Sequence, residues 1–362
     1  MVAIGEREIE DIAAGSAVLG AGGGGSPYIG TLLAKGAIRA YGEVALVDPD
    51  DLGPDALALC VCMVGSPTIG VEKLWNGVEG VRALEAFEAL LDRPITHVAC
   101  LEVGGLNSTV PFAMAAGRGL PVVDGDLMGR AFPHIEMCMP TLYGITTSVA
   151  VADEKGNSAV IHAVDNYWIE RLTRTFTVQV GCQTMAALFP LTASQVREAM
   201  VLRTVSQARS LGQRIRTAHE QGLHPVESLV TGLNGTRLFQ GKVVDVDRRT
   251  EDGWARGAIR VVGLGPHEGR EMTIDFQNEY LVARLDGRPV VTVPDLVIVL
   301  DSDTGHAITT EELRYGFRVD VIGAPCDPRF RTDAGLALVG PPAFGYPDLP
   351  FVGVGEAAAC AA

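Results

Sequence analysis

The order of apolar patterns along the first 165 residues constrains the fold more than any other feature of this sequence. Apolar runs of strand length alternate with segments whose apolar residues recur at helical spacing. The strand-length runs cover residues 43–47, 56–65, 95–103 and 121–124, and the helical segments cover residues 6–19, 29–40, 70–91 and 110–118. This alternation predicts an α/β layered domain over residues 1–165 with a largely parallel sheet, whose ligands bind beyond the carboxyl ends of the strands.

The second half of the chain follows a different pattern. Residues 145–164 contain two strand-like runs around a turn, which predicts a β-hairpin, and a helical region is expected over about 165–221. From residue 236 onward, β-branched and polar residues alternate, with turn signals between the runs. A length of 362 residues suits two domains. We therefore predict a helical junction followed by a β-rich C-terminal domain over residues 166–362.

Charge and composition exclude several classes of partner. The chain has 44 acidic and 29 basic residues, a net charge of −15, and no long cluster of Lys or Arg, so it is not expected to bind nucleic acid. The N-terminus lacks the pattern of a secretory signal, and no stretch has the roughly 18 apolar residues of a membrane span. Seven cysteines, most of them in apolar runs, suit reduced thiols. We expect a cytoplasmic protein without membrane partners, and the sequence leaves a homo-oligomer open.

A run of four glycines at residues 22–25 follows the first predicted helix. Successive glycines allow backbone N–H groups to converge on an anion, and the next helix would add the positive end of its dipole. We therefore expect Gly23, Gly24 and Gly25 to bind part of a substrate. The alternative is a tight connection that binds nothing. No Gly-Lys-Ser/Thr follows the run, so it is not a nucleotide-binding P-loop.

Glu102 lies within an apolar run that ends in two glycines. A buried, unpaired carboxylate is costly, so Glu102 needs a cationic, metallic or hydrogen-bonded partner. Asn107, in the same predicted loop, is a candidate for binding substrate. The alternative is that Glu102 caps a helix or braces the loop.

Asp124, Asp126 and Arg130 lie directly after the last predicted strand of the first domain. Two carboxylates this close push their pKa values apart, which provides one acid and one base, or they clamp a metal. Arg130 would pair with either aspartate or bind a substrate carboxylate. The alternative is an Asp-Arg brace for the loop.

In the C-terminal domain, Asn278 and Glu279 lie in the middle of a predicted strand over residues 274–282, where alternation predicts apolar residues. We expect both side chains to face the cleft between the domains. No motif has the spacing of zinc ligands, so the cofactor stays undetermined. For a divalent metal, the candidate ligands are Glu102, Asp126 and His162.

These segments together resemble a bacterial family first described as a domain of unknown function related to hydantoinase and oxoprolinase proteins, and now named for S-methyl thiohydantoin desulfurase. The resemblance extends over nearly the whole chain, through residues 19–30, 102–108, 122–133, 276–282, 294–296 and 340–346. The sequence departs from the family pattern at Ser26, where members often carry Asp, and at residues 134–136, where they often carry Glu-Leu-Gln.

The resemblance implies hydrolysis of the C–S bond of a 2-(methylthio)imidazolone propionate, a small heterocycle, to a hydantoin and methanethiol in the catabolism of methylated ergothioneine. Asp124 or Asp126 would be the base, with or without a divalent metal. Glu279 is a third candidate catalytic carboxylate and would contact the ring together with Asn278. Arg130 and the glycine run would hold the propionate. Two alternatives stay open, a hydantoinase- or oxoprolinase-like lactam hydrolase and a non-catalytic accessory subunit of such an enzyme.

Overall fold

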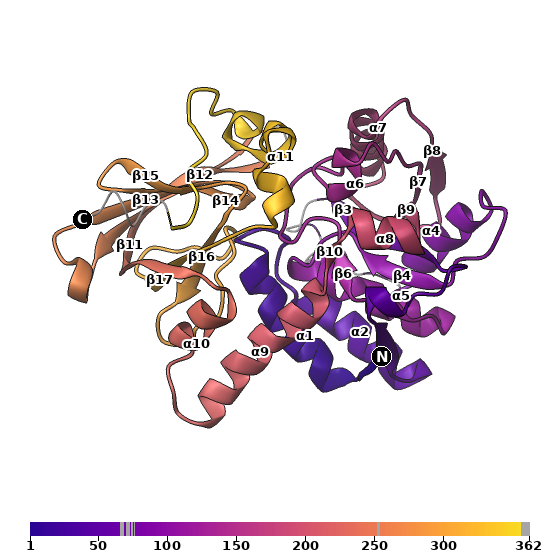
Figure 1. The fold of residues 1–362 in the computed structure, drawn as a ribbon, viewed down its shortest axis with the longest axis horizontal. Coiled ribbons are helices and arrows are strands. Elements are labelled where there is room, and N and C mark those ends of the chain that lie inside the picture. The colour runs from indigo at the N-terminus through magenta and orange to yellow at the C-terminus, as the bar shows by residue number, and fades with distance from the viewer. Residues whose placement is uncertain (66–68, 70–72, 74, 76, 252–253, 356–362) are drawn as a thin grey trace.

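The computed structural model describes residues 1–65, 69, 73, 75, 77–251 and 254–355. The chain forms two lobes, which we call the N-lobe (residues 1–202) and the C-lobe (residues 236–355) (Figure 1). The N-lobe is an α/β layered unit and the C-lobe is built on an antiparallel sheet, with helices at the junction. This arrangement confirms the predicted fold class.

Within the described residues, eight strands form the N-lobe sheet. They are β1 (Val2–Ile4), β2 (Val44–Val47), β5 (Val122–Val123), β4 (His97–Cys100), β3 (Leu57–Gly65), β9 (Gln183–Thr192), β7 (Val149–Ala152) and β8 (Ser158–Ile161), in this spatial order. β2, β5, β4 and β3 run parallel, and antiparallel strands extend the sheet on both sides. β3 is buried along almost its whole length, as expected of a continuous apolar run in a sheet covered on both faces.

Apolar clusters bury both faces of this sheet, and the helices of the N-lobe pack around it. These helices are α1 (Glu6–Leu19), α2 (Tyr28–Tyr41), α4 (Glu79–Glu88), α5 (Val110–Arg118), α6 (Met139–Leu142), α7 (Asn166–Gln179) and α8 (Ala193–Ala199). The predicted helix over residues 70–91 is present only in part, as α4. Residues 77–78 and 89–91 are not helical, and residues 70–72, 74 and 76 lie outside the described residues. A short ladder pairs β6 (Gly125–Asp126) with β10 (Val201–Leu202).

The prediction of a continuous helical region over residues 165–221 was wrong for its central part. Residues 183–192 form β9, which pairs with β3 and β7 near the centre of the sheet. A short buried apolar run is compatible with either a helix or a strand, and periodicity alone does not separate them. The open edge of β3 decides the conformation here, because β9 supplies its hydrogen-bond partners.

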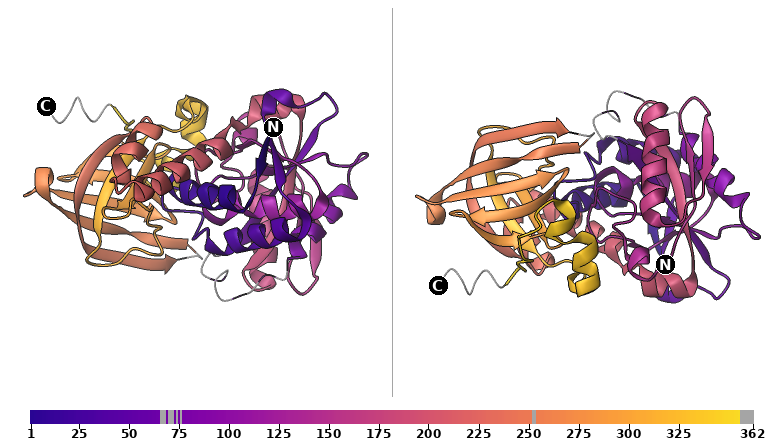
Figure 2. Two further views of the ribbon diagram at one scale, coloured as in Figure 1. Left: turned by 90° about the horizontal axis from the view of Figure 1, so that it is seen from below. Right: turned by 90° about the horizontal axis from the view of Figure 1, so that it is seen from above.

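The junction between the lobes is built on α1 and α9 (Thr204–Glu220), which lie side by side in Figures 1 and 2. A Cβ atom at Gly15 would lie 1.8 Å from the carbonyl oxygen of Ala208, and one at Gly212 would lie 1.9 Å from that of Asp11. Both helices therefore need glycine at their crossing. α10 (Pro225–Gly232) then leads into the C-lobe. None of the helices that the structure describes combines the length and apolar character needed to cross a bilayer.

The C-lobe sheet is entirely antiparallel and, in the part of the chain that the structure describes, has seven strands. Its order is β15 (Arg288–Thr292), β14 (Glu279–Leu285), β13 (Glu271–Gln277), β12 (Trp254–Gly263), β11 (Thr236–Glu251), β17 (Arg318–Ala324) and β16 (Leu296–Asp301). The sheet curls around a core that includes Phe239, Ile274 and Val321 (Figure 2). The remaining elements are α11 (Asp333–Val339) and the short 3₁₀ helices η1 (Pro49–Asp51), η2 (Gly105–Ser108), η3 (Gly265–His267), η4 (Pro328–Arg331) and η5 (Pro341–Phe344).

Asn278 does not lie within a strand, contrary to the prediction of one strand over residues 274–282. It is the turn residue of a tight hairpin, because Gln277 of β13 pairs with Glu279 of β14. Asn278 has a φ of +58°, a left-handed conformation that Asn tolerates better than most residues. The hairpin tip brings Asn278 and Glu279 to the N-lobe.

Candidate active site

A pocket lies beyond the carboxyl ends of β3 and β4, where the two lobes meet. The N-lobe contributes the end of β3, the loop after β4, Met128 and residues 132–135, and α7 contributes Glu170 and Arg174. The C-lobe contributes the hairpin tip with Asn278 and Glu279. The position agrees with the expectation that ligands of an α/β sheet bind outside the carboxyl ends of its parallel strands.

Glu102, in the loop after β4, is a buried carboxyl group in the pocket wall. Its Oε1 accepts a 2.8 Å hydrogen bond from Nδ2 of Asn107, while its buried Oε2 has no hydrogen-bond partner among the described residues. Asn107 is itself held by β3, because its Oδ1 accepts a 2.7 Å bond from the N–H of Met63. Burial raises the pKa of Glu102 to about 8, although the donor from Asn107 acts in the opposite direction. Asn107 therefore orients Glu102 and favours its ionised form.

Glu279 is the second buried carboxyl group of this pocket, and it comes from the other lobe. Burial, and then the charge of Glu102, raise the pKa of Glu279 to about 8, while the Arg130 guanidinium lowers it. Its Oε2 also has no hydrogen-bond partner among the described residues. The neighbouring Asn278 is fixed to the start of β12, because its Oδ1 accepts a 3.1 Å bond from the N–H of Ala255. Burial and mutual repulsion therefore disfavour the state in which both carboxyl groups are ionised, and the pair retains at least one proton more readily than an exposed pair would.

The glycine run connects the two lobes and supports both carboxyl groups. The carbonyl of Gly22 accepts a bond from the N–H of Thr310, and that of Gly24 accepts one from the N–H of Leu106. Gly24 lines the pocket, and a Cβ atom there would lie 2.6 Å from the backbone of Gly104. A Cβ atom at Gly23 would lie 2.3 Å from Oε1 of Glu279. Gly23 therefore leaves the space that Glu279 occupies.

Gly25 packs on the same backbone segment, because its carbonyl oxygen would lie 2.3 Å from a Cβ atom at Gly105. The three predicted glycines are therefore close to the pocket, with Gly24 in its wall. Their predicted role as an anion-binding nest stays a prediction.

Asp124 and Asp126 do not line the pocket, and the structure provides another explanation for each. Asp126 is fully buried and accepts hydrogen bonds from the N–H groups of Val103, Met128 and Gly129 and from the hydroxyl of Thr204. Burial raises the pKa of Asp126 to about 7, and these donors lower it. Because the bond from Val103 fixes the residue after Glu102, Asp126 positions the Glu102 loop.

Asp124 forms a similar local structure at the start of α9. Its Oδ1 accepts a 2.9 Å bond from the N–H of Ser206, and its Oδ2 accepts a 2.5 Å bond from the hydroxyl of that residue. Because burial raises the pKa of Asp124 and both donors lower it, these bonds offset part of the cost of burying the carboxylate. The two aspartates therefore bind different elements and do not form a joint clamp in the pocket.

Arg130 is fully buried and lies outside the pocket lining. Its guanidinium donates to the carbonyls of Ala131 and Tyr280 at 3.2 Å each, Pro294 at 3.0 Å and Asp295 at 2.9 Å. Burial lowers the pKa of Arg130 to about 10, so it remains a cation at neutral pH. The predicted contact with a substrate carboxylate does not fit this geometry, because the donors of Arg130 already join the two lobes. Its charge instead acts on the nearby Glu279.

Comparison with known families provides an independent view of the same chain. A family model described as "S-Me-THD-like, N-terminal domain" matches residues 7–163, and one described as "S-Me-THD-like, C-terminal domain" matches residues 164–354. The chain belongs to the S-Me-THD-like family. This result confirms the resemblance found in the sequence, and it places the Glu102 loop and the Glu279 hairpin of this S-Me-THD-like protein in the two different family domains.

A solved structure has the same fold. A crystal structure of a protein from Chromobacterium violaceum superposes with a TM-score of 0.78 at 23% sequence identity, covering 93% of this chain and 95% of that one. At this identity the likeness shows the fold. No curated protein matches the chain.

The structure of this S-Me-THD-like protein also groups residues that the sequence did not. His134, Glu136 and Glu170 lie together, and His134 and Glu170 line the pocket, whereas the candidate metal ligands Glu102, Asp126 and His162 do not form such a group among the described residues. His162 is exposed and directly follows β8, where its Nδ1 lies 2.6 Å from the hydroxyl of Ser148, the residue before β7. In the sequence, the His134-x-Glu136 spacing directly after Pro133 was the available sign of this cluster. Its third member could not be found in this way, because Glu170 lies 34 residues further along the chain.

Proposed function

We propose that this protein hydrolyses the C–S bond of an S-methyl thiohydantoin, releasing methanethiol and a hydantoin. The observation that carries the proposal is the pair of buried carboxyl groups, Glu102 and Glu279, in one interlobe pocket of an S-Me-THD-like chain. Within this class, the proposed substrate is a 2-(methylthio)imidazolone propionate from the breakdown of methylated ergothioneine.

The environments of the two carboxyl groups support different proposed roles for them. Glu102 receives a hydrogen bond from Asn107, which stabilises its ionised form, so it serves as the general base for water. In the form in which the pair holds one proton, burial and the charge of ionised Glu102 keep that proton on Glu279, so Glu279 serves as the general acid. This assignment replaces Asp124 and Asp126 as catalytic carboxylates, because neither reaches the pocket.

The proposed reaction conserves both protons. Glu102 takes a proton from water as the oxygen bonds to the ring carbon that carries sulfur, and Glu279 protonates the adjacent ring nitrogen. The tetrahedral centre then collapses to a carbonyl, its hydroxyl proton returns to Glu279, and the C–S bond breaks. The leaving sulfur takes the proton held by Glu102, so both carboxyl groups regain their initial states.

The rest of the lining suits such a substrate. Met63, Met128 and Phe132 present polarisable apolar groups to the pocket, which favour contact with a methylthio group. Phe132 is held in place by Phe330, whose ring centroid lies 5.7 Å away in an edge-on arrangement. The guanidinium of Arg174, which is paired with Glu170, brings a positive charge to the lining and would attract the propionate.

The proposal is tested by incubating the purified protein with an S-methyl thiohydantoin and, separately, with the plain thiohydantoin and the hydantoin. Methanethiol is measured with a thiol-trapping reagent, and the ring products are separated by chromatography. We expect methanethiol and intact hydantoin from the S-methyl compound only. Ring opening of the hydantoin without thiol release would instead indicate a lactam hydrolase, and no turnover of any compound would contradict an enzymatic role.

Replacing Gly23 with Ala is expected to lower this turnover by about 10²-fold, the effect of misplacing a catalytic group by about 1 Å. The new Cβ atom would overlap Oε1 of Glu279 at 2.3 Å and its Cγ at 2.5 Å, so the acid must move. The melting temperature should change little. Gly36→Ala is the matched control, because nothing lies within 4 Å of a Cβ atom there. Equal turnover in the two variants would contradict the role of Glu279.

A further inference from the structure

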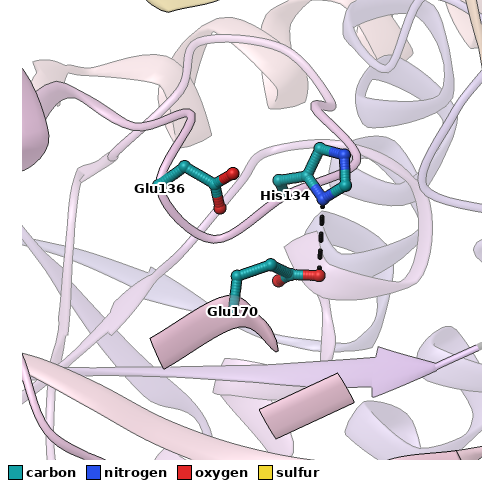
Figure 3. Close-up of side chains that lie close together, drawn as sticks. All are labelled: His134, Glu136 and Glu170. Carbon is teal, nitrogen blue, oxygen red and sulfur yellow. Dashed lines mark hydrogen bonds and ion pairs between the residues drawn. The ribbon is translucent and has the colours of Figure 1, made fainter. Parts of the chain in front are cut away.

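We infer that His134, Glu136 and Glu170 form a binding site for a divalent metal ion in the wall of the interlobe pocket. Nδ1 or Nε2 of the imidazole and one oxygen from each carboxyl group all lie within 4.8 Å of one another. Metal bonds from such ligands are about 2.0–2.2 Å long, so a small closure of these side chains would enclose one ion. Figure 3 shows the three side chains converging on one another from the 134–136 loop and from α7.

The environment of Glu136 is the strongest evidence for a cation at this site. It is 93% buried, since 7% of its surface is exposed, and its Oε2 has no hydrogen-bond partner among the described residues. Figure 3 shows its carboxyl group directed toward His134 and Glu170. A buried carboxylate without a partner is unfavourable, and a cation would supply the interaction that Glu136 lacks.

Glu170 is already oriented in the manner of a metal ligand. Its Oε2 accepts a 3.1 Å bond from the N–H of Ile135, and its Oε1 accepts bonds of 2.8 and 2.6 Å from Arg174. Hydrogen bonds of this kind commonly fix ligating carboxylates from outside the coordination shell. The Nδ1 of His134 lies 3.4 Å from the same Oε1. The cluster holds two carboxyl groups against the one charge of Arg174, so it can offset the charge of a bound cation.

The ligand set indicates the class of metal. One imidazole nitrogen with two carboxylate oxygens suits Zn²⁺ or Mn²⁺, and lacks the six or more oxygens typical of Ca²⁺. Because His134 and Glu170 both line the pocket, the remaining coordination positions would face the substrate. That orientation rests on the proposed function, whereas binding of the ion does not.

The test is metal binding by the full chain after treatment with a chelator. Isothermal titration with ZnCl₂ and with MnCl₂ should give one ion per chain for at least one of them. Glu136→Gln and His134→Asn should each weaken that affinity by at least about 10–100-fold. His162→Asn is the matched control and should bind as the unmodified protein does, because His162 lies outside the cluster. Visible absorption of the Co²⁺ form should report the loss of a nitrogen ligand in His134→Asn.

Saturable binding that Glu136→Gln and His134→Asn leave unchanged would overturn the site, as would no stoichiometric binding of either ion. Circular dichroism of each variant shows that a loss of binding is not a loss of fold. The failure of the proposed function is separate, since Glu279→Gln should lower thiol release by about 10²–10⁴-fold and still bind the ion. If thiol release depends on Glu279 and no ion binds, the proposed function stands and the metal site does not.

Discussion

Replacing Glu279 with Gln is expected to lower methanethiol release by about 10²–10⁴-fold, the contribution typical of a general acid or base. The amide keeps the size of the side chain but cannot transfer a carboxyl proton to the ring nitrogen. The fold should persist, because the environment that raises the pKa of Glu279 to about 8 already favours a neutral group. The measurement is kcat and KM under saturating substrate, beside the melting temperature.

The corresponding variant of Glu102 tests the other proposed catalytic group. Glu102→Gln should lose activity to a similar degree, and the double variant should lose little more, because groups that act in one proton relay are not additive. Glu268→Gln, at an exposed glutamate of the C-lobe, is the matched control and should retain full activity. Near-normal turnover of Glu279→Gln would assign the acid to another residue.

The unfolding free energy provides a readout that needs no substrate. Burial raises the pKa of Glu102 from 4.5 to about 8, so between these pH values the folded chain binds more protons than the unfolded chain. The contribution of Glu102 to stability is therefore full below about pH 4.5 and declines as the pH rises toward about 8. Denaturant unfolding across this window should show a shallower decline in Glu102→Gln than in the unmodified protein.

Replacing Arg130 with Met is expected to destabilise the protein by about 3–5 kcal/mol, a large part of the stability of a typical domain. The change removes the hydrogen bonds that Arg130 donates to the carbonyl groups of Ala131, Tyr280, Pro294 and Asp295, and the two lobes lose a shared contact. Met fills much of the space of the Arg side chain, so the effect reports mainly on hydrogen bonds. Denaturant unfolding and the yield of soluble protein measure it.

Two further variants separate this structural role from substrate binding. Arg39→Met, at an exposed arginine paired with Glu6, should change the stability little. Arg130→Lys should also destabilise the chain, because an ammonium group cannot reproduce the fork of the guanidinium. If Arg130→Met were as stable as the unmodified protein and only KM rose, Arg130 would bind substrate as the sequence first indicated.

Local sequence patterns were sufficient to predict those helices and strands whose own residues favour the conformation that they adopt. Helix α1 could be predicted because Ile9 and Ile12 recur on one face and the first turn is acidic. Strand β3 could be predicted from a nine-residue apolar run. β9 could not, because its conformation depends on the exposed edge of β3, more than 100 residues earlier in the chain. The turn at Asn278 was missed because the residues around it have strand patterns on both sides.

The candidate site shows the same division. The sequence by itself determined the two-lobed fold class, the family, and the two acidic loops at which a carboxyl group interrupts an apolar run. Only the tertiary structure decided that Glu102 and Glu279 face one pocket, that Arg130 is a brace, and that Glu170 joins His134 and Glu136. The physical reason is that a carboxyl group and its environment come from different elements. Asp126, for example, accepts hydrogen bonds from Val103 and Thr204, which are 23 and 78 residues away in the chain. The local sequence around Asp126 does not show whether such distant donors or solvent will surround its carboxyl group.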